Sequence, residues 1–405
     1  MTTAYTQRRG TTVKNDSPAP DQVIVEPETA GSFSQPQPGT PPRSPGATKR
    51  LLPGILVASL TLYATYSALF GVLLPSQIAI LDEENKVENF SFVASISFLF
   101  TIFAQPIVGA ISDRTRSKLG RRAPWMLFGA LIGGILLLGI GSFKSLLWIT
   151  VFWVLIQMAL NALQGPLSAI TPDRFPKNKL GAASAMAGVG MQIGGTLGIM
   201  AAGALAGSLG LAYSAFGIAV IVTTVLFVLF NKDYSSKEST MPTWSWPKFL
   251  KDFWVSTRQN PDFAWAFTAR FLFILGYFVI SSFQLYILTD YIKMSLGDAQ
   301  LAIGTIALAA TLPTLGAIVL AGWWSDKIGR RKIFIYAATV VMISSLAIIL
   351  VMPTMQGMIT SAIVDGIGFG FYMACDTALM NEVLPGKGSA AGKDLGILNI
   401  ATNVP

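Results

Sequence analysis

The sequence contains no histidine and a single cysteine, Cys375, and only 12% of its 405 residues are charged. One cysteine excludes a disulfide within the chain, and the absence of histidine removes the commonest metal ligand and the usual proton carrier near neutral pH. We also find no nucleophile–base pair, no metal-binding cluster and no phosphate-binding glycine loop between a strand and a helix. We therefore expect neither an enzyme nor a cofactor, and any proton coupling must use Asp or Glu.

Hydrophobic residues make up 52% of the chain, and its mean hydropathy is +0.56, which excludes an ordinary soluble domain. The apolar runs reach about 20 residues, enough to cross roughly 30 Å of hydrocarbon at about 1.5 Å per helical residue. We predict ten membrane spans, with an eleventh that begins near Leu395 and is cut off at Pro405. The ten lie at 52–80, 90–111, 125–142, 146–170, 180–206, 211–230, 263–289, 299–324, 333–351 and 356–381.

The net charge of +8 reflects how the cations are distributed along the chain. Of the 29 Lys and Arg residues, 25 lie before the first span or in alternate loops. By the positive-inside rule, these loops and the N-terminus face the cytoplasm. The basic balance thus reports topology and requires no nucleic-acid partner. We expect a multi-pass protein of the plasma membrane, held in the lipid bilayer as a monomer.

The spans divide the chain into four regions. We predict a disordered cytoplasmic tail at 1–50, because its Pro, Ser and Thr cannot bury enough surface to offset the entropy of ordering. A first bundle of six helices follows at 51–230, and an incomplete second bundle at 263–405. The central cytoplasmic loop, 231–262, carries aromatic residues on one helical face. It forms either a helix in the membrane interface or a linker whose aromatics pack on helix ends.

Two basic turns indicate that the chain is duplicated. The first, Gly109–Trp125, reads GAISDRTRSKLGRRAPW, and the second, Gly322–Lys332, reads GWWSDKIGRRK. Their Gly-Arg-Arg segments are 209 residues apart, and the same 209 residues separate Pro176 of a DRFP turn from Pro385 of an EVLP turn. Two landmarks at one offset are typical of internal repeats in transporters. At this offset the last two spans of the second half would extend beyond residue 405, so we expect a truncated chain.

This pattern resembles the major facilitator superfamily over about residues 50–405. The segments SDRTRSKLGRRAPW, DRFP, EVLP and AGKDLGILNIATNVP are also similar to the glycoside-pentoside-hexuronide:cation symporters and the related sucrose-proton carriers. The resemblance implies an all-α polytopic membrane protein with two pseudo-symmetric six-helix halves, the second truncated, which alternate in opening a central site. It also implies that the basic turns are gates. Their residues are Asp113, Arg114, Gly120, Arg121, Arg122, Asp326, Lys327, Gly329, Arg330 and Arg331.

In this fold the first, fourth, seventh and tenth spans line the cavity, and each carries polar and aromatic residues at helical spacing. Such residues in hydrocarbon need partners. They either bond neighbouring helices or contact a neutral polyhydroxylated solute such as a sugar. The candidate substrate-binding residues are Tyr63, Tyr66, Gln77, Gln157, Asn161, Gln164, Tyr277, Gln284 and Tyr372.

Three charged residues inside the spans are candidates for coupling. Arg270 and Asp376 lie at matching depths in the seventh and tenth spans, and we predict an ion pair because an unpaired charge there costs at least about 2.5–3.5 kcal/mol. The alternative is that Arg270 extends alone to the interface. Asp365 lies deeper and has no cationic partner in the pattern. It is our candidate proton carrier.

We therefore predict a cation-coupled, proton-driven importer of a sugar or a similar neutral solute. The nearest alternative is a drug or metabolite exporter of the same fold. A third hypothesis is that the chain is an inactive truncated relative, or a substrate-sensing relative, of such transporters, because the second half lacks its last helices. Transport of a panel of solutes would separate these functions.

Overall fold

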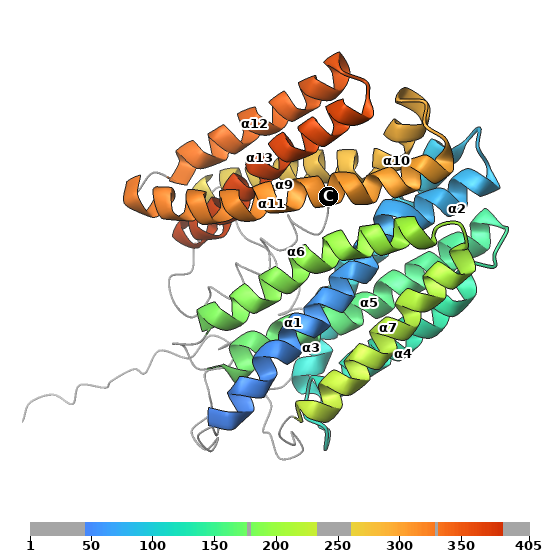
Figure 1. The fold of residues 1–405 in the computed structure, drawn as a ribbon. Coiled ribbons are helices and arrows are strands. Elements are labelled where there is room, and N and C mark those ends of the chain that lie inside the picture. Colours follow the sequence, from blue (N-terminus) through green and yellow to red (C-terminus); the bar gives the residue numbers. More distant parts are fainter. Residues whose placement is uncertain (1–44, 176–179, 233–260, 329–330, 384–405) are drawn as a thin grey trace, which may run out of the picture.

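The computed structural model describes residues 45–175, 180–232, 261–328 and 331–383, and these residues are helical apart from short turns (Figure 1). Proline, glycine and polar residues separate the apolar runs, so the runs form long helices, two of which include π-helical turns. The elements are α1 Pro45–Ala68, η1 Leu69–Leu73, α2 Leu74–Leu81, α3 Lys86–Arg114, α4 Ala123–Ile140, α5 Leu146–Arg174, α6 Leu180–Leu205, α7 Leu209–Phe230, α9 Pro261–Ser282, α10 Gln284–Tyr286, η3 Ile287–Tyr291, α11 Leu296–Ile328, α12 Arg331–Val351 and α13 Met355–Val383.

Nine helical stretches among these residues are long and apolar enough to cross a membrane, which confirms the all-α, multi-pass fold class. The second predicted span, 90–111, lies in α3, which is not one of the nine. The stub that was expected to begin near Leu395 lies outside the described residues. The count of ten spans and part of an eleventh therefore stays a prediction.

The predicted region boundaries differ from the helix ends at two places. Helix α1 begins at Pro45, so residues 45–50, expected in the disordered tail, continue the first helix. Helix α9 begins at Pro261, two residues before the expected start of the second bundle. The predicted interfacial helix of the central loop lies outside the described residues, as does the tail before Pro45.

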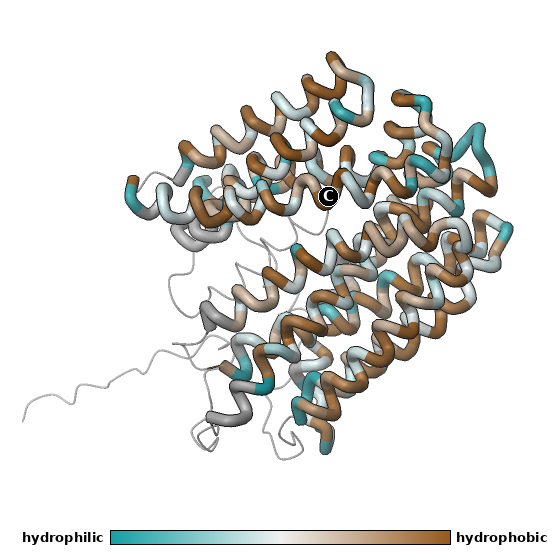
Figure 2. The backbone as a smooth tube through the Cα atoms, in the orientation of Figure 1, coloured by the Kyte–Doolittle hydropathy of each residue, from teal (hydrophilic) through white to brown (hydrophobic). Residues whose placement is uncertain are grey.

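The helices form two groups, α1–α7 and α9–α13, which stand side by side in Figure 1. Within the first group α1 packs along α6, and α4 packs against α5 and α7. Within the second, α11 and α12 both pack against α13. Along the tube in Figure 2, hydrophilic residues gather at turns and helix ends while the helix bodies are apolar. We call these two groups the first half and the second half.

Glycines bring α6 unusually close to α1. Gly190, Gly194 and Gly198 recur every fourth residue on α6, and a Cβ at each would collide with a backbone carbonyl oxygen of α1. The carbonyls belong to Leu56, Leu60 and Ala64, respectively. Small residues at this spacing let membrane helices pack backbone to backbone, where dispersion contacts replace the hydrophobic effect. The α1–α6 pair is therefore a rigid unit in which side chains cannot easily be enlarged.

The two halves touch along α6 and α11. The hydroxyls of Thr196 and Thr311 lie 2.7 Å apart near the middle of these helices, and the amide of Gln300 donates to the Ser76 hydroxyl at 2.9 Å. A Cβ on Gly203 would meet the carbonyl oxygen of Gln300, so the helices are in backbone contact there. In Figure 1 the halves converge near α2 and α10 and diverge toward the opposite ends of α6 and α11.

Candidate functional site

Uncharged polar side chains from α1 and α5 meet inside the first half. Gln164 donates a hydrogen bond of 3.2 Å to the Tyr63 hydroxyl, and the rings of Tyr63 and Tyr66 lie 6.3 Å apart. Within the described part of the chain, the Tyr66 hydroxyl and the Gln157 side-chain oxygen are buried without a hydrogen-bond partner. Burying a polar group without a partner costs about 1–3 kcal/mol. The Tyr66 hydroxyl and the Gln157 oxygen would therefore gain from hydrogen bonds to the polar groups of a bound molecule.

Asn161, also predicted in this set, is held by its own helix. Its amide donates to the backbone carbonyl of Gln157 at 2.8 Å, one turn earlier on α5. Its side-chain oxygen thereby has a fixed direction on the same face as Gln157 and Gln164. Tyr63, Tyr66, Gln157, Asn161 and Gln164 therefore form one cluster, which we call the amide–phenol cluster.

Gln77 does not lie with this cluster, although its spacing in the sequence predicted the same helical face as Tyr63 and Tyr66. Its amide donates to the carbonyl oxygens of Ile140 and Phe143 at 2.9 and 3.3 Å, at the end of α4. Fourteen residues separate it from Tyr63, about 21 Å of helix. The π-helical turn η1 intervenes, and its extra residue rotates the later face away from the earlier one. The structure thus gives Gln77 a role in binding helix ends together.

In the second half, α9 and α13 present the charged pair predicted from sequence. The Arg270 Nη1 and the Asp376 Oδ2 are 3.1 Å apart, and the side chains are 13% and 4% exposed. The predicted ion pair is confirmed, and the alternative of Arg270 extending alone to the interface is wrong. Asp376 Oδ1, the other carboxylate oxygen, is buried without a hydrogen-bond partner among the described residues.

Two stacked aromatic pairs extend the contact between α9 and α13. The rings of Phe273 and Tyr372 lie 3.7 Å apart at 12°, and those of Tyr277 and Phe369 lie 4.3 Å apart at 17°. Each step of three or four residues along α9 is matched by a step of similar size backwards along α13, so the antiparallel helices stay in register. We call these pairs, with Arg270 and Asp376, the α9–α13 ladder. Tyr277 and Tyr372 thus belong to one structure, and their role in binding a substrate stays a prediction.

Gln284 falls outside the ladder. Helix α9 ends at Ser282, and Gln284 begins the short helix α10 after a break at Phe283. The sequence pattern treated 263–289 as one continuous helix, which would have placed Gln284 on the same face as Tyr277. The break interrupts the helical spacing that related Gln284 to Tyr277, and its role in binding a substrate stays a prediction.

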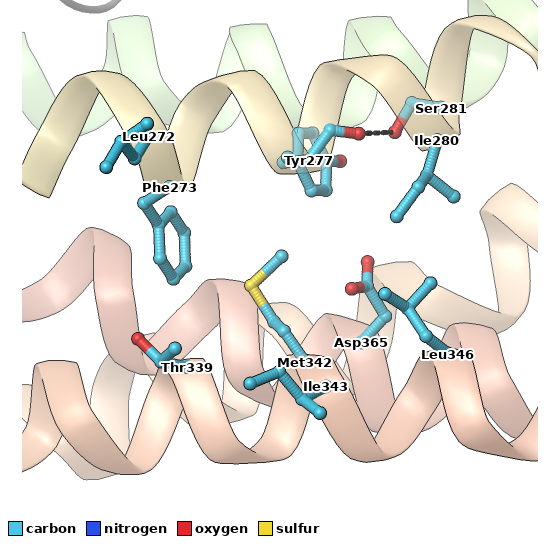
Figure 3. A pocket seen from close by; sticks show the side chains of 11 residues that line it. Leu272, Phe273, Tyr277, Ile280, Ser281, Thr339, Met342, Ile343, Leu346 and Asp365 are labelled. Carbon is cyan, nitrogen blue, oxygen red and sulfur yellow. Dashed lines mark hydrogen bonds between the residues drawn. The ribbon is translucent and has the colours of Figure 1, made fainter.

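Asp365 lines a cavity of about 230 Å³ between α9, α12 and α13 (Figure 3). The other lining residues are largely apolar, with the Tyr277 ring, Met342 and Leu346 nearest in the view. Asp365 Oδ1 lies 3.5 Å from the Ser345 hydroxyl, which is at the limit of a hydrogen bond. The carboxyl group therefore faces a space lined by three helices of the second half, and its role as proton carrier stays a prediction.

The first basic turn is fastened to its own half. Arg121 and Arg122 bind the two carboxylate oxygens of Asp173 at 2.7 and 3.0 Å, and Arg122 also donates to the Ser112 hydroxyl at 2.6 Å. Gly120 has a φ of 87°, a left-handed conformation that glycine adopts without strain. Asp173 was missing from the predicted site, although the repeat register marks it through the DRFP turn. The turn therefore couples the ends of α3, α4 and α5.

The other gating residues are only partly covered by the structure. Arg114 is the last residue of α3, and the Lys327 ammonium lies 5.2 Å from the Trp323 ring centre at the end of α11. The side chains of Asp113, Asp326 and Arg331, together with Gly329 and Arg330, lie outside the described residues, as does the expected start of the eleventh span. The gating role of both turns stays a prediction.

Comparison with known sequences identifies related proteins. A sequence model described as the Major Facilitator Superfamily matches residues 55–405. The multidrug resistance protein MdtG of Rahnella sp. (strain Y9602) is 26% identical over 299 residues, which cover 72% of this chain and 66% of that protein. MdtG of Escherichia coli O9:H4 (strain HS) is 28% identical over 253 residues, covering 60% and 58%. The chain thus matches less than two thirds of the length of these relatives.

Comparison with solved structures supports the same fold. A bacterial homologue of the human lysosomal transporter Spinster, solved in an inward-facing and occupied conformation, aligns with a TM-score of 0.66 and 16% identity. The alignment covers 89% of this chain and 80% of that one. The nucleoside transporter NupG aligns with a TM-score of 0.65 and 16% identity, covering 87% and 88%. At these identities the likeness concerns the fold alone.

Proposed function

Because the chain belongs to the major facilitator superfamily, we propose that it carries a small uncharged polar solute, a sugar in the first instance, across the membrane between its two halves. Membrane transport of a small molecule, the solute class, the coupling cation and the inward direction are all parts of this proposal.

The amide–phenol cluster is the main observation in favour of a neutral, polar solute. Gln164 and Tyr63 are joined by a hydrogen bond, and the neighbouring Tyr66 hydroxyl and Gln157 oxygen are buried with no partner among the described residues. Amides and phenols both donate and accept hydrogen bonds without carrying charge, which matches the hydroxyl groups of a neutral solute. The flat rings of the ladder in the other half suit the apolar face of a sugar ring.

The charged residues of the second half support coupling to a cation. In a chain without histidine, protons must be carried by carboxyl groups, and Asp365 and Asp376 are the two aspartates of α13. Protonation of Asp376 would weaken its pairing with Arg270, because a neutral acid no longer attracts the guanidinium. In this proposal Asp365 receives the proton, while Arg270 and Asp376 respond to it.

Drug export is a second candidate, favoured by a different observation. The cavity at Asp365 combines apolar and aromatic walls with one carboxyl group, which suits an apolar organic cation better than a sugar. The relatives named above are multidrug resistance proteins, as their names state. The two candidates therefore differ in solute charge and in direction.

Transport by the full chain in proteoliposomes tests both candidates. A panel of labelled neutral sugars would be offered with an inward proton gradient, and a labelled lipophilic cation such as tetraphenylphosphonium with an outward gradient. We expect saturable sugar uptake that acidifies the lumen and is lost in Asp365→Asn. Glu84→Gln, an exposed acid in the loop after α2, is the matched control and should transport normally. Transport of the cation alone favours export, and transport of neither solute contradicts both proposals.

A further inference from the structure

Lys86 is a buried cation for which membrane topology offers no reason. It begins α3, its residue is 8% exposed, and it lies on the side predicted to be non-cytoplasmic, where the sequence carries few cations. Lysine is almost never this buried unless it is paired. The positive-inside rule explains cations on the opposite side, so Lys86 requires an explanation from its contacts.

Those contacts lie in the other half of the molecule. The Lys86 ammonium is 2.5 Å from Oδ1 of Asp290 in η3 and 5.6 Å from the centre of the Tyr286 ring in α10. The Lys86 side chain is 11% exposed and that of Asp290 is 47% exposed, so the pair sits at the rim of the interface with its cation inside. Because the cation is largely buried, removing its partner leaves an uncompensated charge, which costs more than losing an ordinary surface pair.

Tyr286 adds two further contacts across the same boundary. Its hydroxyl donates to the backbone carbonyl of Pro75 in α2 at 3.0 Å, and its ring meets Phe90 of α3 edge to face at 5.9 Å. Phe90 also meets Phe283 edge to face at 5.3 Å. An ion pair, a hydrogen bond and a group of rings thus join the ends of α2 and α3 to the end of the seventh span.

We propose that Lys86, Tyr286 and Asp290 form a gate that closes the non-cytoplasmic end of the pathway between the halves. Ser76 and Gln300 lie in the same contact region, where they are 0% and 5% exposed and bonded to each other. These contacts must separate before a solute can enter from that side. This proposal rests on the proposed transport function, because a gate is needed only in a transporter. Whether the gate is closed can nevertheless be measured in the protein without solute.

The test measures access to Ser76 and not transport. Ser76→Cys would be combined with Lys86→Met, with Asp290→Asn or with both, and its reaction with a membrane-impermeant maleimide followed from the non-cytoplasmic side. We expect each single change to speed labelling by roughly 3- to 10-fold. Loss of the partly buried ion pair shifts the equilibrium from the closed gate toward the open gate. The double variant should label no faster than the singles, because both remove one contact.

Two controls separate opening from damage. Lys144→Met removes an exposed cation from the loop after α4, which is predicted to lie on the same side, and should leave labelling unchanged. Cys375 is fully buried against Ala321 and Phe334 within the second half. In chains without Ser76→Cys, it should stay unreactive toward a permeant maleimide unless the protein unfolds.

The outcomes decide the proposal directly. Unchanged labelling in both single variants overturns the gate, and increases that multiply in the double variant show that the two residues act separately. Because no solute is present, a chain that fails every transport assay can still confirm the gate. A chain that transports sugar can likewise refute it.

Discussion

The two halves repeat one helical plan, and both pack helices closely through glycines, but they differ in the polar residues that join their helices. In the first half, α1 meets α6 backbone to backbone through three glycines, and α1 meets α5 through uncharged amides and phenols. In the second half, α9 meets α13 through a buried ion pair and stacked rings. Close packing tolerates little change in shape, whereas an ion pair responds to one proton. We infer that the first half supplies the hydrogen-bonding groups for the solute, while the charged pair of the second half senses the cation.

Breaking the ion pair should have the largest effect. Arg270→Met leaves Asp376 buried and unpaired, and removing one partner of a buried pair typically costs about 3–5 kcal/mol. We expect a large fall in the thermal unfolding midpoint of the purified protein. Arg270→Met combined with Asp376→Leu should recover most of the loss, since neither charge then remains. A double variant as unstable as the single one would contradict this account of the ladder.

Enlarging a glycine at the α1–α6 contact should have the next largest effect. A Cβ at Gly198 would overlap the Ala64 carbonyl oxygen, so Gly198→Ala must push α6 from α1 at a cost of about 1–3 kcal/mol. Gly276 in α9 has open space around the same position, and Gly276→Ala is the matched control. We expect a lower unfolding midpoint for the first variant and an equal or higher one for the second. Equal effects would mean that the close contact does not set stability.

Removing the central hydrogen bond of the amide–phenol cluster should affect solute more than stability. Gln164→Leu deletes the bond to Tyr63, worth about 0.5–1.5 kcal/mol, so the solute's Kd should rise about 2- to 10-fold. Ser168→Ala, one turn later on α5, removes a hydroxyl that bonds only its own helix and serves as control. Equilibrium binding of the transported solute measures both. An unchanged Kd in Gln164→Leu would remove the cluster from the solute site.

The smallest effect is expected at the loops that join the first two spans of each half. Backbone and side-chain hydrogen bonds from Asn85, with one from Asn89, lower the pKa of Asp82 below its usual value. Its ionised form therefore stabilises the loop above the ordinary Asp pKa, and this contribution is lost as pH falls through the lowered value. Asp82→Asn should lower the unfolding midpoint slightly at pH 7 and not in strong acid. Glu84→Gln, which changes a neighbouring acid and leaves the hydrogen bonds from Asn85 and Asn89 to Asp82 in place, is the matched control.

The corresponding loop of the second half is held by a different device. The Ser295 hydroxyl donates to Asp298 Oδ2 at 2.6 Å and accepts the Asp298 backbone N–H at 3.2 Å, a reciprocal arrangement at the start of α11. Asp298→Asn measured in parallel would show whether the two loops contribute equally. A larger effect there than at Asp82 would reverse the order we expect.

Much of this structure could be predicted from sequence because hydrocarbon imposes simple constraints. Apolar length fixed the helices, and the matching depths of Arg270 and Asp376 were enough to pair them. The positions of Gln77 and Gln284 could not be predicted, since a π turn or a helix break changes direction without changing composition. Lys86 and Asp290 were missed because they are 204 residues apart and share no repeat position.

The contact between Thr196 and Thr311 has a mechanical consequence. Leu180, at the far end of α6, lies 16 residues from Thr196, about 24 Å along the helix axis. If the halves swing about this contact as stiff arms, a rotation of about 15° moves the far end by roughly 6 Å, close to the width of a small solute. In that case the Thr196–Thr311 contact is the pivot, and the displacement at the far end of α6 is more than twice the 2.7 Å between the two hydroxyl oxygens.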